Sequence, residues 1–341
     1  MSEDIIAPDT DLHFIKDNHD PQDWQSETTS IASSIYKGLV ENGRKYQTLR
    51  EQGSHVPSDE QMFETYEASH LLAFIIDSDK GNALFQAPVE KPKHILDIGT
   101  GNGTWAIDVA DLFPDATVRG VDLFPPPVTW LPPNCILEVD DILQQWTWRD
   151  PFDLVHLRLL DAAFTPEETD HLYQQCYDHL QPGGWIEQLE MSSFIECDDG
   201  SAPNNSILFD WGHRLTTAAN KAGRPLGIMR TFQGSIEKAG FVDIQTKDYK
   251  WPIGPWPRDK ILKEVGSVNY QHWLIGMEGY GMWLLTKYGD PVPWTKEGVQ
   301  VYVAKMRKEL SNPRIHVYHR ARRIWARKPV DEDWVKVEFS P

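Results

Sequence analysis

The fold of this chain is decided by the stretch Leu96-Asp-Ile-Gly-Thr-Gly-Asn-Gly-Thr104. A short apolar run that begins at His94 leads into it and predicts a buried strand, and the residues from Thr104 to Phe113 predict a helix that stops before Pro114. Glycines between a strand and a helix let the backbone turn sharply and let a ligand come close to it. Ligands of open α/β sheets bind beyond the carboxyl ends of the strands, so this loop is a predicted binding site.

The spacing of the glycines separates this loop from a dinucleotide-binding fingerprint. It reads GxGxG rather than GxGxxG, because Thr104 directly follows Gly103. Asp97 also lies two residues before Gly99, where a carboxylate would repel a pyrophosphate but suits a ligand with positive charge or hydroxyl groups. Both features argue against a nicotinamide-dependent dehydrogenase, and the lack of a P-loop lysine argues against a triphosphate.

Acids at the next two predicted strand ends extend the site. Asp122 ends a strand predicted over 117–123, where a carboxylate can accept both hydroxyl groups of an adenosine ribose. Asp141 follows a strand predicted over 135–140 and can accept a hydrogen bond from an adenine amino group while Ile142 packs against the ring. Asp140 competes with Asp141 for this role. Three successive strand ends thus offer groups for an amino-acid part, a ribose and an adenine.

The rest of the chain alternates between predicted strands and helices. Further strands are predicted at 152–157, 185–189, 241–250 and 315–328, and helices at 166–180, at 207–222 and before Gly240. This alternation implies right-handed crossovers and a parallel sheet covered on both faces.

We expect five segments along the chain. They are a disordered acidic tail (1–28), an N-terminal helical cover (29–90), the core with the loop (91–194), substrate-lid insertions around the sixth strand (195–312), and the last strand with a C-terminal tail (313–341). In the cover, the spacing of Ile31, Ile35 and Leu39 predicts a helix over 29–50, and Pro57-Ser-Asp59 predicts the start of a second helix.

Composition excludes several classes of protein. The 341 residues carry a formal net charge of −18, which repels phosphate backbones, so we expect no nucleic-acid partner. The 3 cysteines form no CxxC, so no disulfide framework or zinc ribbon is predicted. The longest apolar run, 71–76, is too short to span a bilayer, and the first residues lack the pattern of a secretory signal. We therefore expect a cytoplasmic protein with no membrane partner.

The ordered set of motifs carries a family resemblance. The stretch from Ile95 to Glu190 resembles the seven-stranded class I methyltransferase core that binds S-adenosylmethionine. Local strings resemble a narrower group, the LaeA-like methyltransferases of filamentous fungi. These strings are Glu41-Asn-Gly-Arg-Lys-Tyr46, Leu96-Asp-Ile-Gly-Thr-Gly-Asn-Gly-Thr-Trp-Ala-Ile-Asp108, Phe113-Pro-Asp115, Gly120-Val-Asp122, Pro132-Pro-Asn134, Glu138-Val-Asp-Asp141, His156-Leu-Arg158 and Leu180-Gln-Pro-Gly-Gly-Trp185. The resemblance covers about residues 36–190 and fades where substrate choice usually lies.

The resemblance implies a Rossmann-like fold with a seven-stranded, mostly parallel sheet, N-terminal helices and a helical lid. It also implies S-adenosyl-L-methionine as methyl donor. The residues expected to bind the donor are Tyr46, Asp97, Gly99, Gly101, Gly103, Asp122, Leu123, Asp141 and Ile142. Tyr46 would close over the donor; its alternative role is to cap a helix.

Methyl transfer from a sulfonium is an in-line displacement, for which the enzyme aligns the two substrates and excludes water. A general base is needed only for an acceptor such as a weakly acidic hydroxyl or a protonated amine. The candidate catalytic residues are His156, Arg158, Glu190 and His213, and each has an ordinary structural alternative. Asp153, His156 and Asp161 lie close in sequence, but no spacing supports a metal site, so none is expected.

Two functions remain open. The first is a methyltransferase acting on a small aromatic or polycyclic acceptor of secondary metabolism. The alternative is a LaeA-like regulator that works through protein partners, for which a nuclear location would fit. A protein partner or a homodimer is left open for either function. The segment Trp251-Pro-Ile-Gly-Pro-Trp256, with Trp273, Tyr280 and Trp283, favours an enclosed aromatic pocket and hence the enzyme, although core packing is the commoner role of such residues.

Overall fold

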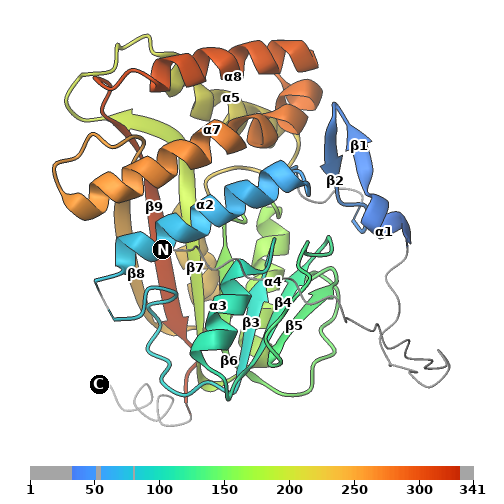
Figure 1. Ribbon diagram of the computed structural model, residues 1–341. Coiled ribbons are helices and arrows are strands. Elements are labelled where there is room, and N and C mark those ends of the chain that lie inside the picture. The colour runs from blue at the N-terminus through green and yellow to red at the C-terminus, as the bar shows by residue number, and fades with distance from the viewer. Residues whose placement is uncertain (1–32, 51–54, 80, 331–341) are drawn as a thin grey trace, which may run out of the picture.

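The computed structural model describes residues 33–50, 55–79 and 81–330 (Figure 1). The predicted acidic tail over 1–28 and the end of the predicted C-terminal segment lie outside the described residues. The five-part division of the chain stays a prediction.

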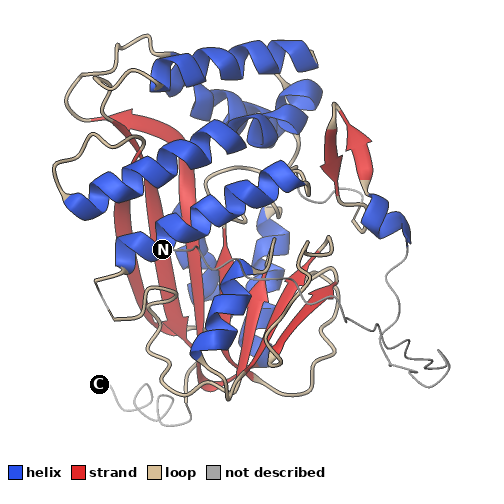
Figure 2. Ribbon diagram, in the orientation of Figure 1, coloured by secondary structure: helices blue, strands red, loops and turns tan. Residues whose placement is uncertain are grey.

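A seven-stranded sheet forms the centre of the molecule (Figure 2). Its strands are β3 (His94–Ile98), β4 (Thr117–Asp122), β5 (Cys135–Val139), β6 (Phe152–Arg158), β7 (Leu180–Cys197), β8 (Val242–Pro252) and β9 (Val317–Arg327). They lie in the order β5-β4-β3-β6-β7-β9-β8. The strands from β5 to β7 pair in parallel, and β9 runs antiparallel to both β7 and β8. This mostly parallel sheet confirms the predicted fold class.

Helices cover both faces of the sheet. The front layer in Figure 1 contains α2 (Glu60–Asp77), α3 (Thr104–Leu112) and α7 (Lys260–Tyr288), and the opposite face carries α4 (Pro166–His179) and α6 (Phe232–Ala239). Adjacent strand residues alternate between the two layers. Ile95 packs with Trp105 of α3, whereas Leu96 packs in the cluster that contains Phe232 of α6. Both faces of the parallel strands are therefore buried, as their near-continuous apolar runs predict.

A further group of helices lies beyond the sheet. It consists of α5 (Ile207–Lys221), α8 (Lys296–Leu310) and part of α7, at the top of Figure 1. A short 3-10 helix, η1 (Ile228–Arg230), follows α5. The helices pack on one another around Trp211, Met277 and Val303, and Ile195 of β7 belongs to the same apolar cluster.

The predicted helix starts at α2 and α4 are confirmed. The Asp59 side chain accepts a hydrogen bond from the backbone N–H of Met62 at 3.1 Å, which caps α2. Thr165 and Glu168 form a capping box at the start of α4, with Pro166 in the first turn.

The helix predicted over 29–50 is wrong for most of its described length. Only α1 (Ser33–Lys37) is helical, and β1 (Leu39–Glu41) and β2 (Arg44–Tyr46) form an antiparallel hairpin. Asn42 has a φ of 54° and Gly43 a φ of 80°, so both turn residues adopt the left-handed conformation that an Asn-Gly hairpin turn requires. This turn chemistry overrides the helical spacing of the flanking apolar residues.

The strand predicted over 185–189 is much longer in the structure. β7 has 18 residues, and its pairing with β9 shifts register between Met191 and Ile195. The extension carries the chain from the centre of the sheet to the helices around α5.

Among the described residues, the helices are all too short or too polar to span a bilayer.

Candidate functional site

A large cavity lies beyond the carboxyl ends of β3, β4, β5 and β6. It encloses about 1110 Å³, part of which is open to solvent. The sheet side of its wall consists of Ile98 to Asn102, Val121 to Phe124, Asp140 to Ile142, Arg158 to Asp161, Ala163 and Phe164. The other side consists of Gln47, Arg50, Val56, Ser58, Phe63 and Tyr66 from the N-terminal segment.

The glycine loop forms the floor of this cavity. Gly99 and Gly101 have φ values of 70° and 59°, and the backbone N–H groups of Gly99 and Thr100 both donate to the carbonyl of Val121. A Cβ atom on Gly101 would lie 3.0 Å from the Tyr66 ring of α2, closer than an ordinary contact. The loop therefore needs glycine both for its conformation and for the space above it. Gly103 lies behind the wall, where it begins α3 with a φ of 81°.

Asp122 lies at the centre of the wall, beside Leu123. Its Oδ2 accepts a hydrogen bond of 2.8 Å from the backbone N–H of Gly101, and its Oδ1 lies 3.4 Å from that of Phe124. Burial raises the pKa of this carboxyl group to about 6 despite these donors. The position combines an acid with the glycine loop, as the sequence predicts.

Asp140, Asp141 and Ile142 form the β5 end of the cavity. Asp141 Oδ1 accepts a 3.1 Å hydrogen bond from the backbone N–H of Leu143 and lies 3.6 Å from Nη1 of Arg50. Ile142 is buried, and Asp140 is exposed at the rim. The structure thus brings both acids that compete for the adenine role to the same end of the cavity.

Besides Gly103, two other predicted donor-binding residues lie outside the cavity wall. Asp97 is buried beneath the glycine loop, where Oδ2 accepts from the Thr100 hydroxyl at 2.7 Å and Oδ1 lies 2.8 Å from Nδ1 of His156. Tyr46 is buried in β2, and its hydroxyl has no hydrogen-bond partner among the described residues. Its neighbour Gln47 lines the cavity instead.

The candidate catalytic histidines lie away from the cavity. The His156 ring stacks on Trp105 with the ring centroids 3.7 Å apart, and burial lowers its pKa. His213 is exposed on α5, where it meets the edge of Phe194. The geometry of His156 is that of a hydrogen-bonded core residue.

Arg158 does line the cavity. Its Nη1 lies 3.2 Å from Nδ1 of His70 on α2, and the other ring nitrogen of His70 lies 2.8 Å from Asp108 of α3. Burial lowers the pKa of Arg158 to about 10, so the group stays charged at neutral pH. A partly buried guanidinium in a cavity wall is suited to a ligand carboxylate.

Glu190 is fully buried on β7 behind the turn that carries Leu160. Its Oε1 accepts hydrogen bonds from the backbone N–H of Leu160 at 2.9 Å and from Nε2 of Gln188 at 2.8 Å. Its Oε2 has no hydrogen-bond partner in the part of the chain that the structure describes. Burial, and next the charge of Asp161, raise the pKa of Glu190 to about 8.

Asp161 is a cavity residue that sequence reasoning considered only as a metal ligand. Its Oδ1 accepts from the backbone N–H groups of Gly227 and Ile228 at 2.8 and 3.0 Å. The signal available in the sequence was its position just after the fourth strand, at the same edge as Asp97, Asp122 and Asp141. No group of three or more His, Cys, Asp or Glu side chains within the described ranges is arranged to hold a metal ion.

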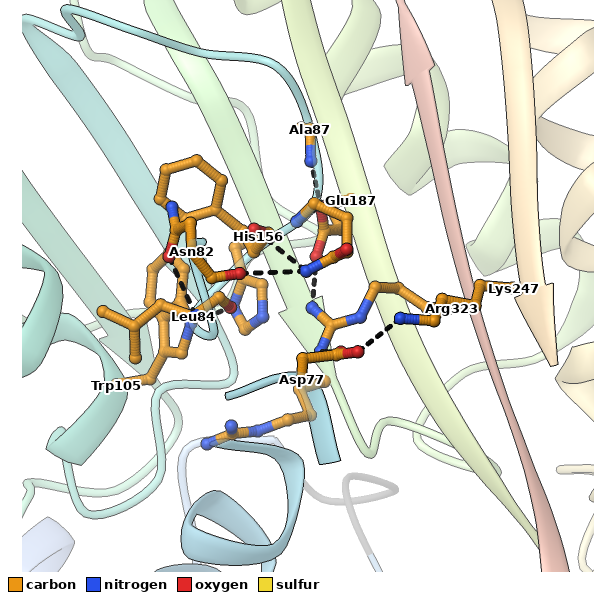
Figure 3. Close-up of polar contacts among 12 residues, drawn as sticks. Asp77, Asn82, Leu84, Ala87, Trp105, His156, Glu187, Lys247 and Arg323 are labelled. Atoms are coloured by element: carbon orange, nitrogen blue, oxygen red, sulfur yellow. Dashed lines mark hydrogen bonds and ion pairs between the residues drawn. The ribbon is translucent and has the colours of Figure 1, made fainter. Parts of the chain in front are cut away.

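A buried ionic cluster fixes the end of α2 to the sheet (Figure 3). Arg323 of β9 bridges Glu187 of β7 and Asp77 at the end of α2, and Asp77 also binds Lys247. Glu187 Oε2 accepts from the backbone N–H of Ala87 at 2.7 Å. Glu187 thus has a structural role.

The predicted aromatic pocket is not formed by the tryptophan-rich segment. Trp251 and Trp273 are buried in the apolar clusters around α7, and neither lines the large cavity. Among the two alternatives stated for these residues, the structure supports core packing.

Comparison with known protein sequences gives three findings. A family model described as a methyltransferase domain matches residues 95–184. Methyltransferase pytC of Aspergillus terreus is 33% identical over 309 residues, which cover 90% of this chain and 93% of that protein. The secondary metabolism regulator LAE1 of Cochliobolus heterostrophus is 36% identical over 299 residues, covering 85% and 94%.

Among solved structures, a phosphoethanolamine N-methyltransferase 2 of Haemonchus contortus, in complex with phosphomonomethylethanolamine and S-adenosylhomocysteine, aligns with a TM-score of 0.45. It is 15% identical, and the match covers 80% of this chain and 58% of that one.

Proposed function

The chain belongs to the LaeA-like methyltransferases of filamentous fungi, and from this premise we propose that it transfers a methyl group from S-adenosylmethionine to a small-molecule acceptor. The observation that carries the proposal is the order of groups along the large cavity. From β5 to β6 the wall offers an acid with an apolar residue, a second acid, a glycine loop and an arginine.

This order matches the parts of the methyl donor from one end to the other. Asp141 and Ile142 would hold the adenine, and Asp122, with Leu123 beside it, would accept the ribose hydroxyl groups. The backbone of Gly99 to Gly101 would lie against the amino-acid part. Phe63 and Tyr66 of α2 face the same cavity and would exclude water from the bound donor.

We assign the carboxylate of the donor's amino-acid part to Arg158. The guanidinium lies in the wall at the β6 end, next to the glycine loop, and His70 and Asp108 hold it from the side of the helices. Asp97 would act as a positioning residue, because both of its oxygens are already used by Thr100 and His156. Gly103 would contribute the turn into α3 rather than a donor contact.

The chemistry of the reaction asks little of the protein. The donor supplies a methyl group on a positively charged sulfur. The side chains around Asp161 and Leu160 would have to align an acceptor with that methyl group and keep water out. Residues 195–312, around the sixth strand β8, would form the lid on the acceptor side, which is the role that we propose for this segment.

Calorimetric titration of the whole chain tests the donor assignment. We expect micromolar binding of S-adenosylmethionine and S-adenosylhomocysteine, and no binding of NAD. The Arg158→Ala variant should bind S-adenosylhomocysteine more weakly, and it should bind 5′-methylthioadenosine, which lacks the amino-acid part, as the natural chain does. Binding of NAD, or of none of these compounds, would contradict the proposal.

The regulatory alternative rests on relatives such as LAE1, whose name describes a secondary metabolism regulator. A second cavity beside the donor cavity favours the small-molecule reading instead. The position of the transferred methyl group separates the two functions. A labelled methyl group in an organic extract supports the enzyme with a cytoplasmic role, whereas label found only on a protein partner, with the chain in the nucleus, supports the regulator.

A further inference from the structure

A second cavity adjoins the donor cavity through Asp161. We propose that it binds the methyl acceptor as an aromatic or enolic hydroxyl compound and that Asp161 takes the proton from the attacking hydroxyl group. The cavity encloses about 370 Å³, part of it open, between Met191 to Phe194 of β7, Thr216 of α5 and the segment around η1. Among the residues named for the two cavities, Asp161 is common to both walls. The inference rests on the proposed function, because it needs a donor in the first cavity.

The order of the strands brings the reactive end of the donor toward Asp161. The adenine end of the first cavity lies at β5, the ribose position at β4, and the glycine loop at β3. β6 is the next strand, and Asp161 follows it by one turn of chain. β7 comes after β6 in the sheet, and its residues from Met191 onward form the second cavity. The methyl group would therefore point from the first cavity into the second.

The turn that carries Asp161 is fixed in an unusual conformation. Leu159 and Ala162, which flank Leu160 and Asp161, have φ values of 56° and 60°. Residues other than glycine seldom adopt such values, and they cluster at functional sites. The backbone N–H of Leu159 donates to the carbonyl of Leu189 at 3.1 Å, so β7 holds the turn against the sheet. A turn that is held in place this way keeps the Asp161 carboxylate between the cavities.

The surroundings of Asp161 favour a base at neutral pH. Gly227 and Ile228 donate backbone N–H groups to its carboxylate, and the charged groups that face it are Glu190 of β7 and Arg230 of η1. Burial raises the pKa of Asp161 to about 6, while the pKa of Glu190 is raised to about 8. At pH 7 Glu190 therefore holds its proton, and Asp161 is ionised and can accept one.

The second cavity suits a flat ring that carries oxygen. Met191, Met229 and Phe194 supply polarizable, apolar contacts for an aromatic or conjugated ring. The Thr216 hydroxyl is buried without a hydrogen-bond partner among the described residues, and the Arg230 guanidinium lies 5.9 Å from the centre of the Phe194 ring. The Thr216 hydroxyl and the Arg230 guanidinium can both hydrogen-bond to an oxygen substituent on the ligand.

Methyl transfer needs only the donor, the acceptor hydroxyl group and the Asp161 carboxylate. The acceptor oxygen forms a bond to the methyl carbon as the bond from that carbon to sulfur breaks. The electron pair of the broken bond goes to sulfur, which becomes the neutral thioether of S-adenosylhomocysteine. The proton of the hydroxyl group passes to the carboxylate of Asp161. The products are a methyl ether and a protonated Asp161, which returns its proton to water.

Binding is tested with 2-naphthol as the probe and with the whole chain saturated with S-adenosylhomocysteine. In protein labelled with ¹³C at the methionine methyl groups, the Met191 and Met229 signals should shift and saturate as 2-naphthol is added. The Thr216→Phe variant fills the second cavity, so these shifts should disappear while the affinity for S-adenosylhomocysteine is unchanged. Shifts that are absent, or that persist in this variant, would overturn the site.

Transfer is tested with S-adenosylmethionine carrying a labelled methyl group. We expect 2-naphthyl methyl ether to form, with a rate that rises through about pH 6. Asp161→Asn keeps an oxygen for the N–H groups of Gly227 and Ile228, yet it should lower the rate by about 10²-fold or more and abolish this rise. The matched control is Asp153→Asn, because Asp153 accepts from the backbone N–H groups of Lys93 and His94 far from either cavity.

The outcomes separate this inference from the proposed function. If S-adenosylhomocysteine fails to bind in calorimetry, the proposed function itself fails. If it binds, and 2-naphthol occupies the second cavity without being methylated, the hydroxyl acceptor is overturned. If the rate in Asp161→Asn equals that in Asp153→Asn, the role of Asp161 as base is overturned.

Discussion

The carboxylate of Asp122 serves the protein and the proposed ligand at once. One oxygen anchors the backbone N–H of Gly101, and the group retains lone pairs that face the cavity. Asp122→Ala should weaken S-adenosylhomocysteine binding by about 1–3 kcal/mol, because the ribose hydroxyl groups and the Gly101 N–H lose their acceptor. Calorimetry measures the loss, and Asp150→Ala is the control, because Asp150 is exposed before the start of β6 and does not line the cavity. Equal affinities would remove Asp122 from the ribose site.

Glu190 makes the stability of the protein depend on pH. Its pKa rises from 4.5 to about 8 on folding, so the native state binds the extra proton between these values. Where the native state holds more protons than the unfolded state, the free energy of unfolding falls as pH rises. This single group should contribute a fall of about 1.4 kcal/mol per pH unit between roughly pH 5 and 7.

Glu190→Gln should remove this contribution, since the amide has no proton to lose in that range. Urea unfolding of both proteins at several pH values measures it. As pH rises, the unfolding free energy of the natural chain should fall relative to that of the variant. A constant difference would mean that Glu190 titrates normally.

Individual site residues were predictable where a motif fixes their place on a strand. Asp122, Asp141 and Ile142 lie in the cavity wall. They were predictable because the carboxyl ends of neighbouring parallel strands lie at the same edge of the sheet. Asp97 carries the same signal, but the pairing of β3 with β6 sets it beside His156, which takes its carboxylate out of the wall. Asp161 was missed as a cavity residue because its position depends on the positive φ values of Leu159 and Ala162. Neither residue type predicts such a conformation.

At the scale of elements, the glycine loop joins β3 to α3 and its shape is set by backbone conformation. Gly101→Val should abolish donor binding while the protein stays folded, since the side chain would meet the Tyr66 ring on α2. Gly200→Val is the matched control, because Gly200 has a φ of 70° but no atom within 4 Å of its added Cβ. Calorimetry and circular dichroism on both variants test this. Retained binding in Gly101→Val would show that the loop does not hold the donor.

The attachment of α2 to the sheet depends on buried charges. Asp77 and Arg323 are almost fully buried, so Asp77→Ala leaves a buried guanidinium with one acidic partner fewer. The free energy of unfolding should fall by about 3–5 kcal/mol. Asp248→Ala breaks an exposed pair with Arg322 on the neighbouring strand and should cost less than about 1 kcal/mol. Similar losses in urea unfolding would contradict the importance of the buried cluster.

Elements were predictable where local chemistry and hydrophobic spacing agree. The starts of α2 and α4 carry capping residues at the positions where helices begin, and both starts were found. In the segment before them the two signals disagree. Apolar residues at helical spacing flank Asn42-Gly43, and the structure follows the turn. The length of β7 was missed for a different reason: its second half pairs only with β9, more than a hundred residues later in the chain.

On the scale of the whole molecule, the donor cavity joins five separate stretches of the chain between residues 47 and 164. Donor binding should therefore slow amide hydrogen exchange in residues 56–66, 98–102 and 159–164 together, because all three line the cavity. Residues of α8 contribute nothing to the wall and should exchange at unchanged rates. Hydrogen exchange with and without S-adenosylhomocysteine measures this. Protection confined to 98–102 would mean that α2 does not close over the donor.

The topology of the sheet was predictable because a repeated strand-helix pattern admits few arrangements. The packing of the outer helices was not. The sequence left both a pocket and the commoner core position open for Trp251 and Trp273. Only their packing around α7, β8 and β9 decides between the two. Such choices depend on contacts between segments that share no local pattern.

The wall of the second cavity has a consequence for how the protein can diversify. Apart from Asp161, it comes from one uninterrupted piece of chain, residues 191–230, whereas the sheet side of the first cavity comes from earlier residues. A chimaera that takes this piece from a homologue would exchange the acceptor compartment and leave the donor compartment intact. If the second cavity holds the acceptor, as we propose, the choice of acceptor can change through this one continuous segment while the sheet side of the donor cavity stays the same.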